Sequence, residues 1–177
     1  MEVSKKVVFI KDWILNYVNS MPVKAQSLVI GISGGIDSSV TSTLCAMTGL
    51  KTIVLTMPIK QNKEQNDLSL LHNKWLSDKF NNVESHSLEL DNVFKNFENT
   101  LSNFKSEHGM ANSRSRLRMT TLYQVATANN GIVVGTGNKV EDFGVGFYTK
   151  YGDGGVDISP IADCKKTEVW EMGSKMS

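Results

Sequence analysis

The run SGGIDSS, residues 33–39, holds the side chains best suited to chemistry in this 177-residue sequence. Gly34 and Gly35 can adopt backbone conformations that other residues avoid, and they leave room for a phosphate beside the main chain. Three serines add short hydroxyl donors. Asp37 adds a carboxylate that either caps a helix or holds Mg²⁺ against phosphate oxygens. We therefore predict a cradle for the pyrophosphate part of a nucleotide.

The same run lacks the two commonest phosphate motifs. No lysine follows the glycines as in GxxxxGK[ST], which disfavours transfer of a γ-phosphoryl group by a P-loop enzyme. GxGxxG is also absent, which argues against a dinucleotide redox fold. The plain alternative is a tight strand-to-helix turn with Asp37 as its cap, but that alternative leaves the serines unexplained.

A second group of polar residues lies in NSRSRLRM, residues 112–119. Arg116 precedes Met119 by three residues, one turn along the predicted core-facing stripe of a helix. An arginine there offers a forked donor for a carboxylate or phosphate. Arg114 and Arg118 are spaced i and i+4, and we interpret these two as a solvated helix face.

Two further segments follow a predicted strand. In VVGTGNKVED, residues 133–142, Thr136 lies where open α/β sheets bind ligands, and Glu141 is either a second Mg²⁺ ligand or a solvent-facing loop acid. GFYTKYGDGGVDISP, residues 146–160, is a long glycine-rich loop with aromatic residues. Loops of this length within a domain are usually functional.

The elements that must position these residues alternate between strands and helices. Short apolar runs predict strands, and apolar residues at helical spacing predict helices, the best of them with Met119, Leu122, Tyr123 and Ala126 on one face. This order predicts an α/β fold, an open parallel sheet with helices on both faces in a Rossmann-like arrangement. The predicted strands are 27–32, 51–57, 83–90 and 131–136, and the predicted helices are 4–19, 37–47, 63–80, one carrying Phe94, Phe97, Leu101 and Phe104, 111–128, and one carrying Val169, Met172 and Met176.

Composition narrows the class of protein. Hydrophobic residues are 40% and charged residues 21% of the chain, as in ordinary globular proteins, and one domain over residues 1–177 is expected. A net charge of +1 gives no reason to expect nucleic acid or a membrane surface as a partner. The two cysteines, Cys45 and Cys164, form no CxxC, so we expect a reduced, cytoplasmic protein without a zinc site.

SGGIDSS after an apolar strand resembles the signature SGGxDS of the N-type ATP pyrophosphatases, whose fold is that of the adenine nucleotide alpha hydrolases. NxxxRxRM, GTGNxxED and TKYGDGGxDxxP resemble the NAD synthetases within that superfamily, and in particular the ammonia-dependent type. The resemblance runs from about the first helix to the last residue. It implies that the nicotinate carboxylate of deamido-NAD attacks the α-phosphorus of ATP and that ammonia then displaces AMP.

The resemblance also implies roles for individual residues, with no general base among them. Mg²⁺ would be held by Asp37 and Glu141, and deamido-NAD by Arg116, Lys150 and Asp157. A homodimer is implied as well. The implied ATP contacts are Gly31, Ile32, Ser33, Gly34, Gly35, Ile36, Asp37, Ser38, Thr136 and Lys166.

The sequence departs from the family pattern at its C-terminal side, because it stops within or just after a helix while members of the family continue. An alternative is therefore a nucleotide-binding but catalytically incomplete member of the family. A second alternative is another adenylating or tRNA-modifying enzyme that shares SGGIDSS, against which TKYGDGG argues.

Overall fold

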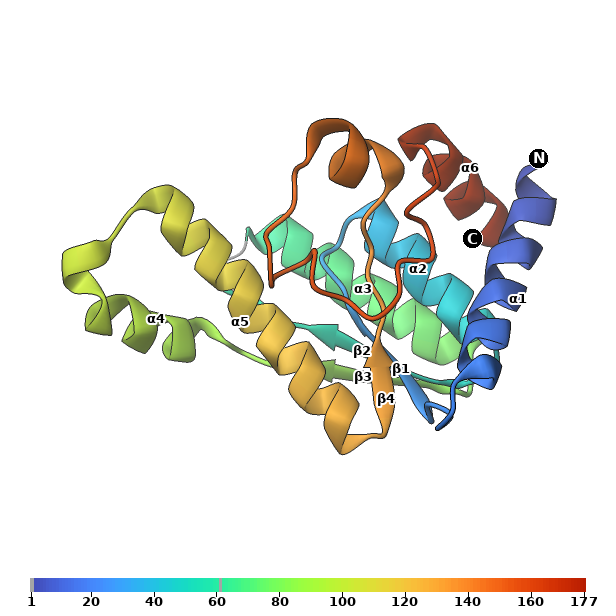
Figure 1. Cartoon of the computed structure of the whole chain (residues 1–177), viewed down its shortest axis with the longest axis horizontal. Coiled ribbons are helices and arrows are strands. Elements are labelled where there is room, and N and C mark those ends of the chain that lie inside the picture. The colour runs from blue at the N-terminus through green and yellow to red at the C-terminus, as the bar shows by residue number, and fades with distance from the viewer. Residues whose placement is uncertain (1, 61) are drawn as a thin grey trace.

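The computed structural model describes residues 2–60 and 62–177 and contains one parallel sheet with the strand order β3-β2-β1-β4 (Figure 1). The predicted α/β fold is confirmed. The elements in chain order are α1 (Val3–Ser20), β1 (Ser27–Gly31), α2 (Ile36–Met47), β2 (Lys51–Thr56), α3 (Lys63–Lys79), β3 (Val83–Ser87), α4 (Asp91–Thr100), the 3₁₀ turn η1 (Ser102–Phe104), α5 (Glu107–Ala128), β4 (Gly131–Val133), the π-helical turn η2 (Val140–Val145) and α6 (Lys166–Met176).

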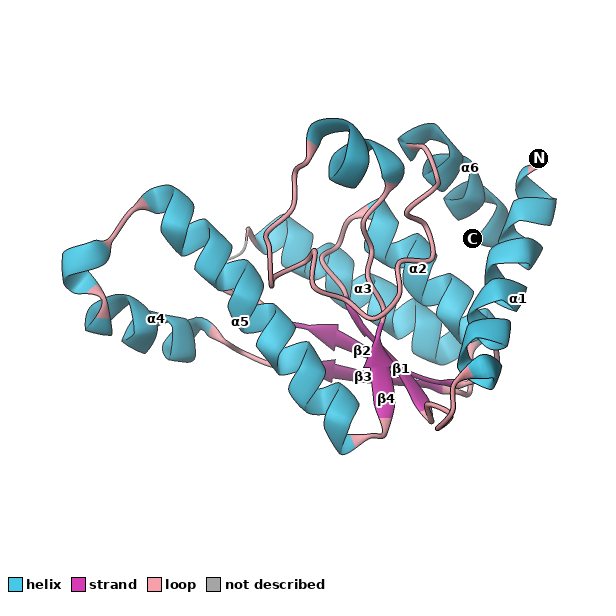
Figure 2. Cartoon of the chain, viewed as in Figure 1, coloured by secondary structure: helices cyan, strands magenta, loops and turns pink. Residues whose placement is uncertain are grey.

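The two central strands are apolar on both faces because helices cover the sheet from both sides (Figure 2). One face packs against α1, α2, α3 and α6, with Leu28 and Ile30 of β1 and Val54 of β2 in that core. The other face packs against α4 and α5, with Val29 and Ile53 in that core. Such continuous burial is typical of parallel strands between helical layers.

The sheet register brings the carboxyl ends of β1, β2 and β4 to one edge. Leu28 pairs with Thr52 on one side and with Ile132 on the other, so the three strands run in step. The segments that follow them, SGGIDSS after β1 and GTGN after β4, therefore emerge beside each other. Ligands of open α/β sheets bind at this edge.

Three details of helix burial differ from the sequence-based expectation. In α1 the buried stripe continues through Val18, while Tyr17 is exposed. In α3 the sequence places Leu68, Leu71 and Trp75 on one apolar face. Trp75 is partly buried against the core, but Leu68 and Leu71 are exposed. The buried side chains of α3 are Ser69, Asn73 and Leu76, and Asn73 bonds to Thr56 at the end of β2.

The expected core-facing helix through Phe104 is also shorter than predicted. Phe94 is buried, but Phe97 and Phe104 are exposed, and α4 ends at Thr100 before the turn η1. The arm formed by α4, η1 and the start of α5 extends away from the sheet (Figure 1), so little of the chain covers it. No helix formed by residues 2–60 and 62–177 has the length and hydropathy needed to cross a membrane.

Polar contacts also join α2 to α3 below the ligand-binding edge. Ser42 Oγ lies 2.9 Å from His72 Nε2, and the imidazole stacks on Trp75 with 5.6 Å between ring centroids. Burial lowers the pKa of His72 to about 4. The folded protein therefore holds this imidazole neutral under conditions where the unfolded chain protonates it.

We predict that His72 makes stability pH-dependent. Between pH 6.5 and 4 the unfolded chain binds a proton that the folded protein does not, so the free energy of unfolding falls as the pH falls. The expected loss is on the order of 1 to 2 kcal/mol, discounted because the site is partly exposed. Urea unfolding over this pH range should show a shallower slope for His72→Gln than for the wild type. His108→Gln, at an exposed position, is the control, and an unchanged slope in His72→Gln would contradict the prediction.

Candidate functional site

The turn between β1 and α2 is shaped by Gly34. Its φ is +85°, a left-handed conformation that residues with a side chain rarely adopt. A Cβ on Gly34 would lie 2.4 Å from the carbonyl oxygen of Gln65 in α3. Glycine is thus required both by the backbone conformation and by the close approach of α3.

The serines of this turn bond to one another and to its backbone. Ser38 Oγ donates to the Gly35 carbonyl at 3.0 Å and accepts from the Ser33 N–H at 3.3 Å. Ser39 Oγ also reaches the Gly35 carbonyl at 3.0 Å, and the Gly35 N–H donates to Ser33 Oγ at 3.3 Å. Ser33 and Gly35 nevertheless remain exposed. The first N–H groups of α2 have no carbonyl partner within the helix, so the turn is a ready-made anion site.

Asp37 is not the N-cap of α2, because Gly35 holds that position and Asp37 lies within the first turn. Its carboxylate instead accepts a hydrogen bond from Asn138 Nδ2 at 3.2 Å and pairs with the ammonium of Lys166. Lys166 Nζ also lies 2.9 Å from Glu141 Oε1. Three residues that are far apart in the sequence therefore meet beside the turn.

The two carboxylates set the direction in which the pKa of Lys166 shifts. Burial alone would lower the pKa of Lys166, but hydrogen bonds and Coulombic attraction from Asp37 and Glu141 outweigh burial and raise it. The lysine is cationic near neutral pH as a result. Glu141 pairs with Lys166 although its side chain is 45% exposed, and its role as a Mg²⁺ ligand stays a prediction.

Asn138 holds Asp37 and the start of the turn η2 in place through hydrogen bonds. It is fully buried, and its Oδ1 accepts the N–H groups of Val140 at 3.0 Å and Glu141 at 3.2 Å, while its amide nitrogen holds Asp37. Glu141 lies in the π-helical turn η2, a conformation often found at functional sites. Asn138 lies in the GTGN motif, but the sequence-based prediction gave it no role. Its position between the end of β4 and Glu141 was the feature that could have pointed to it.

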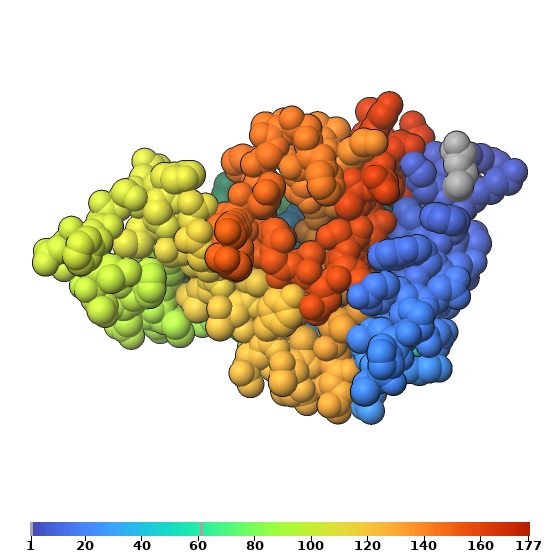
Figure 3. Space-filling view, viewed as in Figure 1, coloured from blue at the N-terminus to red at the C-terminus, as the bar shows by residue number. Residues whose placement is uncertain are grey.

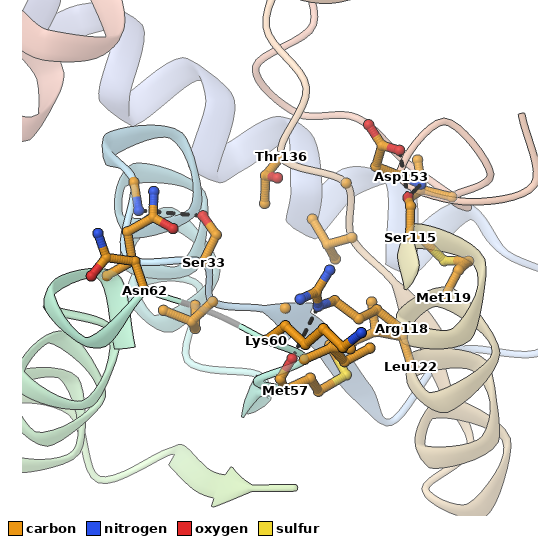
Figure 4. Close-up of a pocket in the computed structure, with 18 residues that line it drawn as sticks. Ser33, Met57, Lys60, Asn62, Ser115, Arg118, Met119, Leu122, Thr136 and Asp153 are labelled. Carbon is orange, nitrogen blue, oxygen red and sulfur yellow. Dashed lines mark hydrogen bonds between the residues drawn. The ribbon is translucent and has the colours of Figure 1, made fainter. Parts of the chain in front are cut away.

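A cleft of about 530 Å³ opens in front of the turn (Figures 3 and 4). In Figure 3 it is the hollow between α5 and the later segments, with atoms of the first third of the chain visible at its floor. Its walls combine apolar side chains with a few polar groups, as ligand pockets do. The predicted residues Gly31, Ile32, Ser33, Gly35 and Thr136 line it, together with Met57, Ile59, Lys60, Asn62, Gln65, Ser115, Arg118, Met119, Leu122, Val134, Gly135, Asp153 and Val156.

Arg118 overturns one expectation. It is half-buried in the cleft wall rather than on a solvated helix face, and its Nε donates to the Met57 carbonyl at 3.0 Å. Figure 4 shows the guanidinium pointing into the space between Ser33 and α5. Burial and the nearby Arg114 lower the pKa of Arg118. Spacing alone could not reveal this, because the wall opposite α5 is formed by the distant residue Met57.

The glycine-rich loop is docked onto the start of α5. Ser115 Oγ donates to Asp153 Oδ1 at 2.7 Å and accepts from the Asp153 N–H at 3.0 Å. Thr149 Oγ1 donates to Asn112 Oδ1 at 2.8 Å. A Cβ on Gly152 would lie 2.3 Å from Ser115 Oγ. The segments 112–115 and 149–155 are therefore held together by side-chain hydrogen bonds and close packing.

The three predicted dinucleotide contacts divide into two places. Arg116 is exposed, and its Nε donates to the Lys150 carbonyl at 3.1 Å, so these two residues lie together outside the cleft lining. Asp157 lies elsewhere. Its carboxylate accepts from the Val133 N–H at 2.7 Å and from the Tyr123 hydroxyl at 3.0 Å. Asp157 thus joins the loop to β4 and α5.

The remaining predicted contacts act through the backbone or through packing. The Ile32 N–H donates to the Leu55 carbonyl at 2.8 Å, which carries the pairing of β1 beyond its last residue. Ile36 packs in the core beside α6, where a Cβ on Gly173 would lie 2.8 Å from Ile36 Cδ1. This contact sets α6 over α2 and so places Lys166 above Asp37.

The carboxylate pair suits Mg²⁺. Mg²⁺ usually takes one or two protein carboxylates, with substrate phosphates and water completing its shell. Asp37 and Glu141 already share one cationic group, which shows that both can reach a common positive charge. Within residues 2–60 and 62–177, no group of three or more His, Cys, Asp or Glu side chains could hold a metal alone. A metal at this pair would need phosphate oxygens as further ligands.

Comparison with known proteins identifies the family. Residues 6–177 match the family described as NAD synthase. The chain belongs to the NAD synthase family. It is 38% identical over 154 residues to the NH(3)-dependent NAD(+) synthetase of Carboxydothermus hydrogenoformans, covering 84% of this chain and 60% of that protein. The NAD synthase match thus spans about three fifths of that relative's length.

Solved structures agree with this assignment. The NH3-dependent NAD synthetase of Campylobacter jejuni superposes with a TM-score of 0.88 at 30% identity, covering 99% of this chain and 74% of that one. The NMN synthetase of Francisella tularensis superposes with a TM-score of 0.83 at 35% identity, covering 98% and 68%. The predicted fold and family are thereby confirmed.

Gly34→Ala tests the shape of the turn, with Gly49→Ala as its matched control. Both glycines have positive φ, but a Cβ on Gly49 meets nothing within 4 Å. Gly49→Ala should cost roughly 1–2 kcal/mol of stability. Gly34→Ala should cost roughly 3 kcal/mol, because α3 must also shift, and should weaken ATP binding at least about tenfold. Urea unfolding and calorimetric titration with ATP measure both. Equal losses in the two variants would contradict this account.

Proposed function

We propose that this chain performs the amidation step of NAD synthesis, using ATP to activate a nicotinate carboxylate and ammonia as the nitrogen donor. The observation that carries the proposal is the meeting of Asp37, Glu141 and Lys166 beside the turn whose Ser33 and Gly35 line a cleft of about 530 Å³. The family supports the class of reaction. Because the chain covers 60% of the Carboxydothermus relative, activity of this chain itself is part of the proposal.

The proposed chemistry is mostly positioning. The turn at 33–39 holds the β- and γ-phosphates through backbone N–H groups, and Thr136 and Lys166 contact the nucleotide. The nicotinate carboxylate, already ionised near pH 7, attacks the α-phosphorus and pyrophosphate leaves, giving an adenylate. Ammonia then attacks the acyl carbon, AMP leaves with the electron pair of its bond, and the new amide nitrogen releases one proton to water. Mg²⁺ on Asp37 and Glu141 would offset the charge of the phosphates.

Arg116, Lys150 and Asp157 are proposed to bind the substrate that carries the nicotinate. Arg116 and Lys150 lie together and present two cations near the exposed Tyr148 and Tyr151, which suits a phosphate with an attached ring. Asp157 is proposed to contribute by holding the loop against β4, in addition to any contact with substrate. Arg118 joins the set as a cation facing the cleft.

One comparison suggests a second substrate, although the Carboxydothermus NAD synthetase is 38% identical to this chain. The Francisella structure, an NMN synthetase, shares 35% identity with this chain, against 30% for the Campylobacter NAD synthetase. Production of NMN by amidation would use the mononucleotide acid in place of deamido-NAD. The catalytically incomplete, nucleotide-binding protein also remains an alternative, motivated by the partial coverage of the relatives.

A homodimer in the cytoplasm completes the proposal. The protruding arm exposes Val93, Phe97 and Phe104 at 51%, 42% and 79%, an apolar surface suited to a second copy. Cys45 and Cys164 are buried free thiols, which is in keeping with a reducing compartment.

The product assay tests the proposed reaction. ATP, Mg²⁺, ammonium and either deamido-NAD or nicotinic acid mononucleotide should yield AMP and pyrophosphate in equal amounts, and the faster acid identifies the substrate. Asp37→Asn should lower the rate at least about 100-fold, because it weakens the hold on the metal and phosphates. Asp78→Asn, at an exposed end of α3, should leave the rate unchanged. Release of ADP would refute the mechanism, and ATP binding without AMP would favour the incomplete alternative.

Sedimentation tests the proposed dimer. We expect a dimer at micromolar concentration, and we expect Phe104→Glu to shift it toward monomer because a charge enters the apolar surface. Phe143→Glu, a similarly exposed aromatic outside the arm, is the control. A stable wild-type monomer would contradict the proposal.

A further inference from the structure

Lys166 occupies the position that a metal ion would need. Its ammonium contacts Asp37 and Glu141 at once, from the first turn of α6. The Asp37 side chain is 15% exposed, while those of Lys166 and Glu141 are 37% and 45% exposed. Asp37 is thus the most enclosed of the three side chains, and those of Lys166 and Glu141 have room to move.

We infer that Lys166 is the resident cation of the Asp37–Glu141 pair, and that it excludes a divalent ion until a nucleotide's phosphates give the ammonium another partner. The inference rests on the proposed nucleotide-binding function and deepens it. Lys166 would thus be the residue that couples metal binding to nucleotide binding, and its charge is already in place before any ligand binds.

Electrostatics requires some cation at this pair. Two carboxylates brought to one point repel each other, and a nearby positive charge removes that cost. Asn138 bonds to the Asp37 carboxylate and to the backbone N–H of Glu141, so it keeps the two segments that carry the carboxylates together. Lys166 therefore offsets the repulsion between the two carboxylates while no metal is bound. A metal ion that arrives without a nucleotide must displace Lys166 from the same carboxylate oxygens.

A nucleotide changes this balance. Phosphate oxygens bound at the turn would accept hydrogen bonds from the Lys166 ammonium. The carboxylate oxygens of Asp37 and Glu141 then become free to bind the metal. Nucleotide should then raise the affinity for metal, and by linkage metal should raise the affinity for nucleotide by the same factor. A permanent structural salt bridge predicts the opposite, since its removal would disorder the pair and weaken metal binding.

Mn²⁺ alone is the probe, titrated into the protein without nucleotide and followed by electron paramagnetic resonance. Lys166→Met should bind Mn²⁺ about tenfold more tightly than the wild type, within the usual range of coupling between sites. Lys166→Arg, which retains the charge, should resemble the wild type. Lys165→Met removes the same charge from the neighbouring exposed residue and should also leave the affinity unchanged.

The second measurement repeats the titration with a non-hydrolysable ATP analogue. The increase in Mn²⁺ affinity caused by the analogue should be about tenfold larger in the wild type than in Lys166→Met. Thermal unfolding checks that each variant is folded, and Lys166→Gln replaces Lys166→Met should the latter not fold. Metal affinity that is unchanged or weaker in the folded neutral variants would overturn the inference. A positive Mn²⁺ result without AMP formation would reject the proposed reaction and keep this inference.

Discussion

The structure depends on one ammonium group placed between two carboxylates. Asp37 comes from α2, Glu141 from η2 and Lys166 from α6, so a single charge cluster joins three segments, in addition to the direct packing of α6 on α2. Buried Asn138 turns this contact into a fixed geometry, because its amide bonds on both sides. The turn at 33–39, the π-helical turn and the last helix therefore hold their positions relative to one another by charge as well as by packing.

Much of this arrangement follows from local sequence. β1, β2 and β4 were predictable because their apolar runs are short and end at or just before glycine or proline, and the turn was predictable because SGGIDSS lies between a buried strand and a helix. β3 has no such run, because residues 84–87 are polar. The meeting of the strand ends at one edge then follows from parallel pairing alone. Asp37 and Glu141 were predicted as candidate Mg²⁺ ligands in this way, whereas Lys166 was implied only by the resemblance to the NAD synthetases.

The remaining features depend on contacts between distant residues. Arg118 was taken for a surface residue because helix spacing cannot tell which face meets the Met57 carbonyl. Leu68 and Leu71 were expected in the core because their spacing suits burial, whereas α3 buries Asn73, which donates to Thr56 at 2.8 Å. The bonds of Asn138 to Asp37, 101 residues away, and of Ser115 to Asp153, 38 residues away, were missed for the same reason, since such distant partners leave no periodic signal.

The anchoring of Asp157 also affects how this sheet meets other chains. β4 is an outer strand, and residues 157 and 158 return along it, with the Asp157 N–H donating to Val133 and the Gly135 N–H donating to Ile158. One border of the sheet is thus closed by the chain itself. The opposite border, β3, has exposed residues 84–87 that include the charged Glu84. Unwanted strand pairing between molecules is therefore confined to a border that carries charge, a common protection against aggregation.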